Sequence, residues 1–343
     1  MKKLLAILSI LAITTPCVFA EHLEVLPLMT SKTKQQNRVW VGTFQLAWND
    51  LMNEIVKGPV KFNGETPLLV KQLNKQPFKA EHLDESSYYK TFGKTSLTLK
   101  SEIESAIKQK FNETSDILDN LDWSKGAGKY TIYAMLKKNF KFLTAFDKLK
   151  PEKFARSNKK FDYFGINKES DKILDNTVNV LFYNSPKDFA VSIDTQSADV
   201  VYLYRTNNNK TLDKLYFDMI VKESRYNGNS EFLKDDELKI PNISLYSEKT
   251  FDELCGKQIR GTDIVIGQAI ETVDFKMDNE GVKLKSEAAI ATKMSILQPD
   301  KKIKPRKFYF NDTFVVFLQH SNENIPYFAL RVKDLSIINK TGR

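Results

Sequence analysis

Residues 271–292 read ETVDFKMDNEGVKLKSEAAIAT. The first part continues a strand-like run that begins at Ile270, and the polar residues Asp278–Gly281 end it. Beyond this break, the even-numbered residues from Val282 to Ile290 are apolar or small, and they alternate with mostly charged or small neighbours. A period of two is typical of a strand with one buried face. The stretch therefore predicts a strand, a break and a second extended segment.

The rest of the C-terminal third is predominantly of β pattern. We expect a strand at 238–245, a short helical turn at 251–254, a strand over 308–318 and another over 327–332. A polar turn at 321–324 separates the last two strands. Both are strongly apolar, so they are expected to form a hairpin in the core.

This order of features resembles the serpin family over about residues 236–334. Serpins combine an apolar-Pro step in a strand, a helix that ends in Asp/Glu-Leu, a strand that leads into Asn-Glu-Glu-Gly, and a hinge of small residues. An exposed reactive loop and a Phe-rich hairpin ending in Gly-Arg-Val follow. The matching residues here are Ile240-Pro241, Asp252-Glu253-Leu254, Asn279-Glu280-Gly281, Ser286 to Thr292, Phe310 to Leu318 and Arg331-Val332.

The resemblance implies a single α+β domain over residues 21–343, with a large central β-sheet, a smaller β-sheet portion and N-terminal helices. Residues 129–146 are similar to a central-sheet strand of the family. From the residues themselves we expect a loose leader at 21–38, and helices at 41–55, from a capping box at 101–104, at 117–121 and at 212–220. Strands are expected at 178–183, 188–193 and 199–204. Helices thus come first and strands later.

The resemblance also implies a mechanism, in which a protease cleaves the reactive loop, here about 282–305. The loop then inserts into the main sheet as an extra strand and distorts the acyl-enzyme. The partner implied is a serine or cysteine protease, and the protein itself is expected not to be an enzyme. The hinge falls on Glu280, Gly281, Ser286, Glu287, Ala288, Ala289, Ile290, Ala291 and Thr292. The candidate scissile region is Lys293, Met294, Ser295, Ile296 and Leu297.

Two features depart from the inhibitory pattern. Residues 282–285 stand between Gly281 and the hinge, whereas in the family the glycine directly precedes the hinge. Counting from either Gly281 or Ser286 also gives no clear specificity residue. The first alternative is therefore a non-inhibitory serpin-fold binding protein that uses the groove or the basic loop, and the second is an exported hydrolase.

The N-terminus has the three parts of a secretory signal peptide: Lys2-Lys3, an apolar run over 4–13, and Val18-Phe19-Ala20 as a cleavage site. Residues 1–20 are therefore predicted to be removed, and the protein to be secreted or periplasmic. Cleavage would remove Cys17, leaving Cys255 as the only thiol, which we expect to be buried and structural.

The 343 residues are 41% hydrophobic, as in an ordinary globular protein, and carry a net charge of +9. Three histidines, two cysteines and the lack of any recognised enzyme motif predict no metal, no cofactor and no triad. The densest basic cluster is Lys301, Lys302, Lys304, Arg306 and Lys307. It lies on the expected loop and its exit, where it could hold a polyanion or an acidic protease surface. No specific nucleic-acid binding is predicted, and a monomer is expected.

Overall fold

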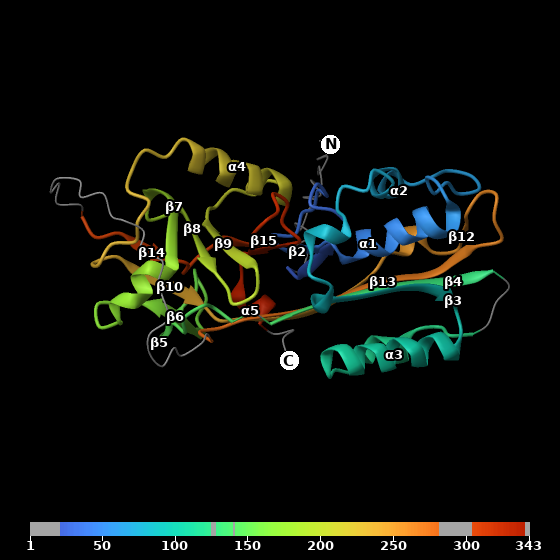
Figure 1. The fold of residues 1–343 in the computed structure, drawn as a ribbon, viewed down its shortest axis with the longest axis horizontal. Coiled ribbons are helices and arrows are strands. Elements are labelled where there is room, and N and C mark those ends of the chain that lie inside the picture. Colours follow the sequence, from blue (N-terminus) through green and yellow to red (C-terminus); the bar gives the residue numbers. More distant parts are fainter. Residues whose placement is uncertain (1–20, 125–127, 140, 281–303, 340–343) are drawn as a thin grey trace, which may run out of the picture.

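The computed structural model describes residues 21–124, 128–139, 141–280 and 304–339. Their strands form three sheets (Figure 1). The main sheet has the order β11-β13-β4-β3, with the short β12 paired to β13. Its strands are β3 (Tyr88–Lys94), β4 (Lys129–Asn139), β11 (Ile243–Thr250), β12 (Lys257–Gln258) and β13 (Val265–Met277). β4 and β13 are the longest strands described, and they lie side by side.

The second sheet has seven strands in the order β1-β2-β16-β15-β9-β8-β7. They are β1 (Leu23–Leu26), β2 (Asn37–Val41), β7 (Val178–Ser185), β8 (Asp188–Asp194), β9 (Asp199–Arg205), β15 (Phe314–His320) and β16 (Phe328–Val332). The third sheet, β14-β10-β6-β5, has four. They are β5 (Asp147–Lys153), β6 (Lys160–Ile166), β10 (Glu237–Pro241) and β14 (Lys307–Tyr309). One hydrophobic cluster draws residues from all three sheets, including Leu203, Leu238 and Phe275.

Two helices cover opposite faces of the main sheet (Figure 1). α1 (Thr43–Asp50), extended by a π-helical turn at Leu51–Val56, buries Phe44 and Trp48 against one face. α3 (Leu97–Phe111) buries Ile103 and Ile107 against the other. The remaining helices are α2 (Leu68–Leu73), α4 (Leu212–Ser224) and α5 (Leu335–Ile338). Short 3-10 turns lie at Ala80–His82, Glu85–Ser87, Asp116–Asn120, Lys172–Thr177 and Asp252–Leu254.

Several sequence-based expectations hold. The hairpin of β7 and β8, the neighbouring β9 and the antiparallel pair of β15 and β16 are all present. The helix predicted at 212–220 is α4, and the helical turn predicted at 251–254 is the 3-10 turn Asp252–Leu254. The strand predicted from Lys129 is β4, at the centre of the main sheet.

Other expectations are wrong. Residues 21–38 are no loose leader, because β1 and the buried start of β2 lie within them. The first half also supplies β3 and β4, so helices do not simply precede strands. The predicted strand at 308–318 is two strands of different sheets, β14 and β15, since Asn311-Asp312 interrupts it. Residues 238–245 are likewise divided between β10 and β11.

Candidate functional site

The candidate site is the seam along which β4 and β13 pair in parallel. Eleven residue pairs form this ladder, from Val265 with Lys129 to Lys276 with Asn139, with one irregularity between Ile266 and Gln268. Both strands have an antiparallel neighbour on their other side, β3 for β4 and β11 for β13. Parallel pairing is slightly less stable per residue than antiparallel pairing. Among the described residues the seam is thus the one parallel ladder of the main sheet, flanked by antiparallel ladders that are slightly more stable per residue.

Side chains alternate across the seam between its two covered faces. Ala134, Ala269 and Val273 belong to clusters on the α1 side, whereas Tyr133 and Ile270 belong to the cluster under α3. An extra strand placed in the seam would therefore meet an apolar layer on either side. Small side chains would enter such a slot with the least displacement of these layers.

One ionisable group, Glu271, lies buried in the middle of the seam. It pairs with Ala134 across the ladder and has no exposed surface. Its Oε1 accepts hydrogen bonds from Thr43 Oγ1 at 2.8 Å and from the Phe44 N–H at 3.0 Å, both at the start of α1. Its Oε2 is buried and accepts no hydrogen bond from the residues that the structure describes. Burial raises the pKa of Glu271 to about 8, so the carboxyl is protonated at neutral pH.

A second polar cluster fastens β4 to the seven-stranded sheet. Lys138 Nζ lies 2.6 Å from Asp199 Oδ2 and donates to Ser87 Oγ at 3.0 Å. Tyr327 donates its hydroxyl to Asp199 Oδ1 at 3.0 Å, so both carboxylate oxygens are used. Lys138 and Asp199 are buried, and each compensates the charge of the other. This cluster fixes the end of β4 that lies near the exit of β13.

The chain that leaves β13 is held by backbone hydrogen bonds. The carbonyl of Asn279 accepts from Phe146 N at 3.1 Å, and the carbonyl of Glu280 accepts from Phe142 N at 3.0 Å. The Asn279 side-chain amide also donates to the Phe146 carbonyl at 3.3 Å. Glu280, the first predicted hinge residue, is therefore placed where the chain leaves the main sheet.

The chain returns through Arg306, which is buried and bound to Asp236. Its Nη2 lies 2.7 Å from Asp236 Oδ2, its Nε 3.1 Å from the same oxygen, and its own backbone N–H donates to Asp236 Oδ1 at 2.7 Å. Nη1 donates to the Asn229 carbonyl at 2.6 Å. Arg306 was predicted to lie in an exposed polyanion-binding cluster, and this is wrong. A buried, bidentate arginine is instead an anchor.

Of the other predicted site residues, some are described by the structure and some are not. Lys304 and Lys307 are exposed. Residues Gly281, Ser286 to Thr292, Lys293 to Leu297, Lys301 and Lys302 lie outside the described residues, as does the predicted signal peptide. The structure thus places the two ends of the expected reactive loop, one on the main sheet and one on β14.

Sequence reasoning missed Glu271, Lys138 and the Asp236–Arg306 pair. For Glu271 and Lys138 the only sequence signal is an ionisable residue inside an apolar strand pattern. This signal does not reveal their partners. Asp236 and Arg306 are seventy residues apart in the chain, so only the fold shows that they meet.

Three further observations on the described residues concern a metal site, a reactive cysteine and a membrane-spanning helix. They contain no group of three or more His, Cys, Asp or Glu arranged to hold a metal ion. The half-buried Cys255 thiol donates to the Phe251 carbonyl at 3.5 Å, and burial raises its pKa, as expected of a structural cysteine. None of the helices in the described ranges is long and apolar enough to cross a membrane.

No family model and no curated protein matches the sequence. Solved structures do match the fold. SRPN18 from Anopheles gambiae has a TM-score of 0.54 and 7% identity, over 90% of this chain and 95% of that chain. Serpin48 from the insect Tenebrio molitor, described as a highly specific serpin, has a TM-score of 0.52 and 13% identity, over 89% of this chain and 93% of that chain. The fold of this chain, a single α+β domain around the β4–β13 seam, is therefore serpin-like.

Proposed function

We propose that this protein is an exported protease inhibitor that acts by inserting its cleaved reactive loop, residues 282–305, into the β4–β13 seam. The observation that carries the proposal is the direct parallel pairing of β4 with β13. β13 runs straight into the loop, so the loop would reverse direction and enter antiparallel to both strands. One parallel ladder would then be exchanged for two antiparallel ladders, and this exchange supplies the driving force.

The two ends of the loop supply the reason why cleavage is needed. One end follows the backbone-held residues Asn279 and Glu280, and the other precedes the buried Arg306–Asp236 pair in a different sheet. In the uncut loop both ends are held. If the loop filled the whole seam, the same residues would also have to reach back to β14. Cutting the loop removes this constraint, and the free end can follow the seam.

The alternation within the loop is compatible with such a strand. In the clusters on the α1 side, β13 supplies odd-numbered residues such as Val273 and Phe275. A register that pairs them with even-numbered loop residues would put Val282, Leu284 and Ala288 on this apolar face. The opposite register would bury Lys283 and Lys285 there instead, at a high desolvation cost, whereas in the first register they would lie on the face of β13 that carries Asp274 and the exposed Lys276. We therefore expect Ala288 to face the same side as Val273 after insertion.

The test is complex formation with a panel of serine and cysteine proteases. The inhibitor should form an SDS-stable complex, and cleavage of the loop should raise the unfolding temperature. Ala288→Arg should be cleaved normally but form no complex and gain no stability, because its side chain cannot enter the seam. Ala288→Ser, which keeps a small side chain, is the matched control and should behave as the wild type.

A specific sequence feature favours a non-inhibitory binding protein as the second candidate. Residues 282–285 lengthen the segment between Gly281 and the hinge. A loop that is nicked without any gain in stability would reject trapping and support this candidate. Hydrolase activity that survives removal of residues 293–304 would contradict both.

The accessory parts of the proposal are a signal peptide at 1–20 and a basic loop that steers an acidic protease surface. Export predicts a mature chain that begins at Glu21 and carries a net charge of 9 − 2 = +7, since two lysines are removed. With Arg306 excluded as buried, the steering residues are Lys301, Lys302, Lys304 and Lys307. Replacing these four by glutamine should slow association and reduce its salt dependence.

A further inference from the structure

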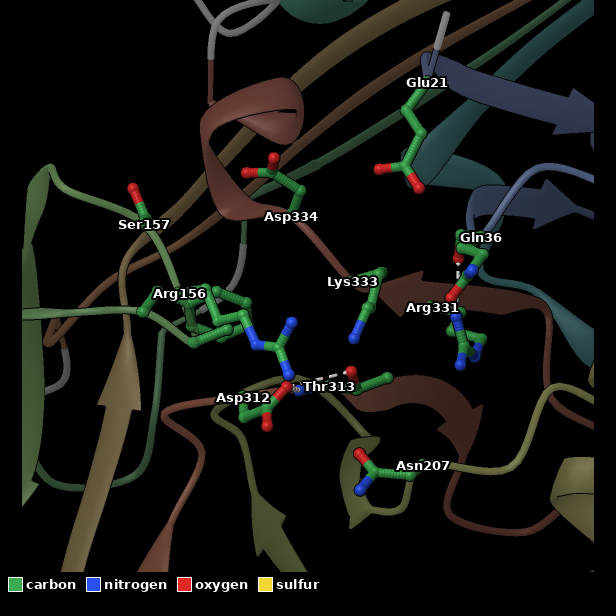
Figure 2. A pocket seen from close by; sticks show the side chains of 12 residues that line it. Glu21, Gln36, Arg156, Ser157, Asn207, Asp312, Thr313, Arg331, Lys333 and Asp334 are labelled. Carbon is green, nitrogen blue, oxygen red and sulfur yellow. Dashed lines mark hydrogen bonds between the residues drawn. The ribbon is translucent and has the colours of Figure 1, made fainter. Parts of the chain in front are cut away.

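A cavity of about 580 Å³ lies outside the seam, at one end of the seven-stranded sheet (Figure 2). β9 and β16 end beside it, and β2 and β15 begin there. Its lining includes Arg331 from β16, Thr313 directly before β15, Arg156 from the β5–β6 connection, and Lys333 from the segment before α5. None of its lining residues belongs to the main sheet.

Positive charge is buried at this end of the sheet. Arg331 is 1% exposed and Arg38 is 2% exposed. Arg331 donates to the carbonyls of Asn208 at 3.1 Å and Gln36 at 2.9 Å. Arg38 donates to the Gln35 carbonyl at 3.1 Å and to Asn209 Oδ1 at 2.7 Å.

Within the described ranges, neither guanidinium forms an ion pair with a carboxylate. Buried charges are costly when no opposite charge compensates them. This cost is visible in Arg331, whose pKa is lowered to about 10, mainly by burial and then by the charge of Arg38, although Asp312 and Glu21 partly offset the shift. An anion beside Arg331 would reduce the cost.

Two further cations reach the cavity from its sides. Figure 2 shows the Lys333 amine and the Arg156 guanidinium directed into the space between their elements. Lys333 is half-buried and Arg156 is exposed. Among the described residues neither forms a salt bridge, although the charge of Lys333 helps to lower the pKa of Asp312. The Ser157 hydroxyl, also in the lining, accepts from Lys159 N at 3.1 Å and keeps a hydrogen to donate.

Two of the three carboxylates in the lining already accept hydrogen bonds from the protein. Asp312 accepts from Thr313 N at 2.6 Å and lies 3.6 Å from Arg205 Nη2. Asp334 accepts from Ser336 N at 2.8 Å, as the N-cap of α5. Glu21 is exposed at the edge. These acids would repel a polyanion, whereas one anionic group could still sit between the cations.

We propose that this cavity binds a small molecule through one phosphate or carboxylate group, held between Lys333 and Arg156 above Arg331. Its volume falls within the range of small-molecule sites, roughly 300–1,000 Å³. Ala155 in the lining is exposed and, beside the buried Phe154, offers an apolar contact for the remainder of the ligand. The inference rests on no part of the loop-insertion proposal.

Titration calorimetry on the mature full-length protein would test this, with phenyl phosphate, benzoate and the neutral control phenol at constant ionic strength. At least one of the two anions should bind, and phenol should not. Because both side chains reach solvent, the double variant Lys333→Gln, Arg156→Gln should fold and bind the anion at least ten-fold more weakly. Lys159→Gln, on the same β5–β6 connection but outside the cavity, should bind as the wild type.

The tighter of the two anions would show whether a phosphate or a carboxylate is preferred. Lack of binding by both, or unchanged binding in the double variant, would overturn the proposal. An independent measurement is acetylation of lysines followed by mass spectrometry. The bound anion should slow modification of Lys333 and leave that of Lys159 unchanged, and equal rates at Lys333 with and without the anion would also overturn it.

Discussion

Glu271 makes the middle of the seam sensitive to protonation. Its carboxyl is fully buried and, within the described part of the chain, accepts hydrogen bonds at one oxygen only; burial raises its pKa from 4.5 to about 8. In the unfolded chain it would ionise at its ordinary pKa. The folded state therefore holds a proton that the unfolded state loses between these two values.

We predict that this stabilisation is fully present below about pH 4.5 and is lost as the pH rises toward 8. A shift of this size corresponds to a change in unfolding free energy on the order of 3–5 kcal/mol. Glu271→Gln should flatten this part of the profile, because an amide does not ionise. Urea unfolding at pH 5, 7 and 9 measures the effect. The exposed Glu253→Gln should retain the wild-type profile, and an equally steep profile in Glu271→Gln would contradict the prediction.

The Arg306–Asp236 pair is the other residue-scale feature with a large expected effect. Arg306→Met leaves the Asp236 carboxylate buried without its cation. Breaking one side of a buried pair typically costs about 3–5 kcal/mol. Chemical denaturation should show this loss, whereas the exposed neighbour Lys307→Met should change stability by less than about 0.5 kcal/mol. Similar stabilities for the two variants would show that Arg306 is no anchor.

At the scale of single elements, α3 is the cover of one face of the seam. Its position follows from Leu99, Ile103 and Ile107, which lie four residues apart and are buried. The helix begins after Ser96, whose hydroxyl accepts from Leu99 N at 3.1 Å. The predicted capping box at 101–104 is wrong because these residues lie inside the helix. Ser-x-x-Glu occurs on helix surfaces as well as at helix starts, so the motif alone does not fix the boundary.

Truncation of the covering face should destabilise the protein. Ile103→Ala removes a fully buried side chain between α3 and the main sheet and should cost about 2–5 kcal/mol, through lost burial and the cavity left behind. The exposed Ser105→Ala on the same helix is the control and should leave stability nearly unchanged. Both are measured by urea unfolding. A small effect of Ile103→Ala would mean that α3 packs only loosely on the seam.

At the scale of the whole molecule, the three sheets share one core but differ in how their strands are joined. The seven-stranded sheet is antiparallel except at β1–β2, whereas the main sheet contains the long parallel ladder of β4 and β13. Opening this ladder leaves the outer pairs β3–β4 and β11–β13 intact. If the sheet parts along this line, its two halves therefore keep their own pairing.

If the cleaved loop inserts here, hydrogen exchange should report it directly. Amides of β4 and β13 should exchange more slowly after the loop is nicked, because each strand gains an antiparallel partner in place of a parallel one. Amides of β8 and β9, within the seven-stranded sheet, serve as the internal reference and should change little. Unchanged exchange along β4 and β13 in the nicked protein would contradict insertion.

The sequence by itself determined the local features of this protein and the type of its fold. The strand before the loop, the hairpin of β7 and β8, α4 and the helical turn at 252–254 each follow from a contiguous pattern of apolar and turn residues. The order of these elements was enough for the resemblance to serpins. The reactive loop expected at about 282–305 stays a prediction, because most of it lies outside the described residues.

The tertiary structure decided which of these residues meet. Sequence patterns report local geometry and burial, whereas an ion pair or a parallel ladder joins segments that lie far apart in the chain. Three features depend on such contacts. Arg306 is buried against Asp236, Glu271 of β13 accepts a hydrogen bond from the start of α1, and residues 308–318 are divided between two sheets. The β4–β13 seam is of the same kind, because more than a hundred residues separate its two strands.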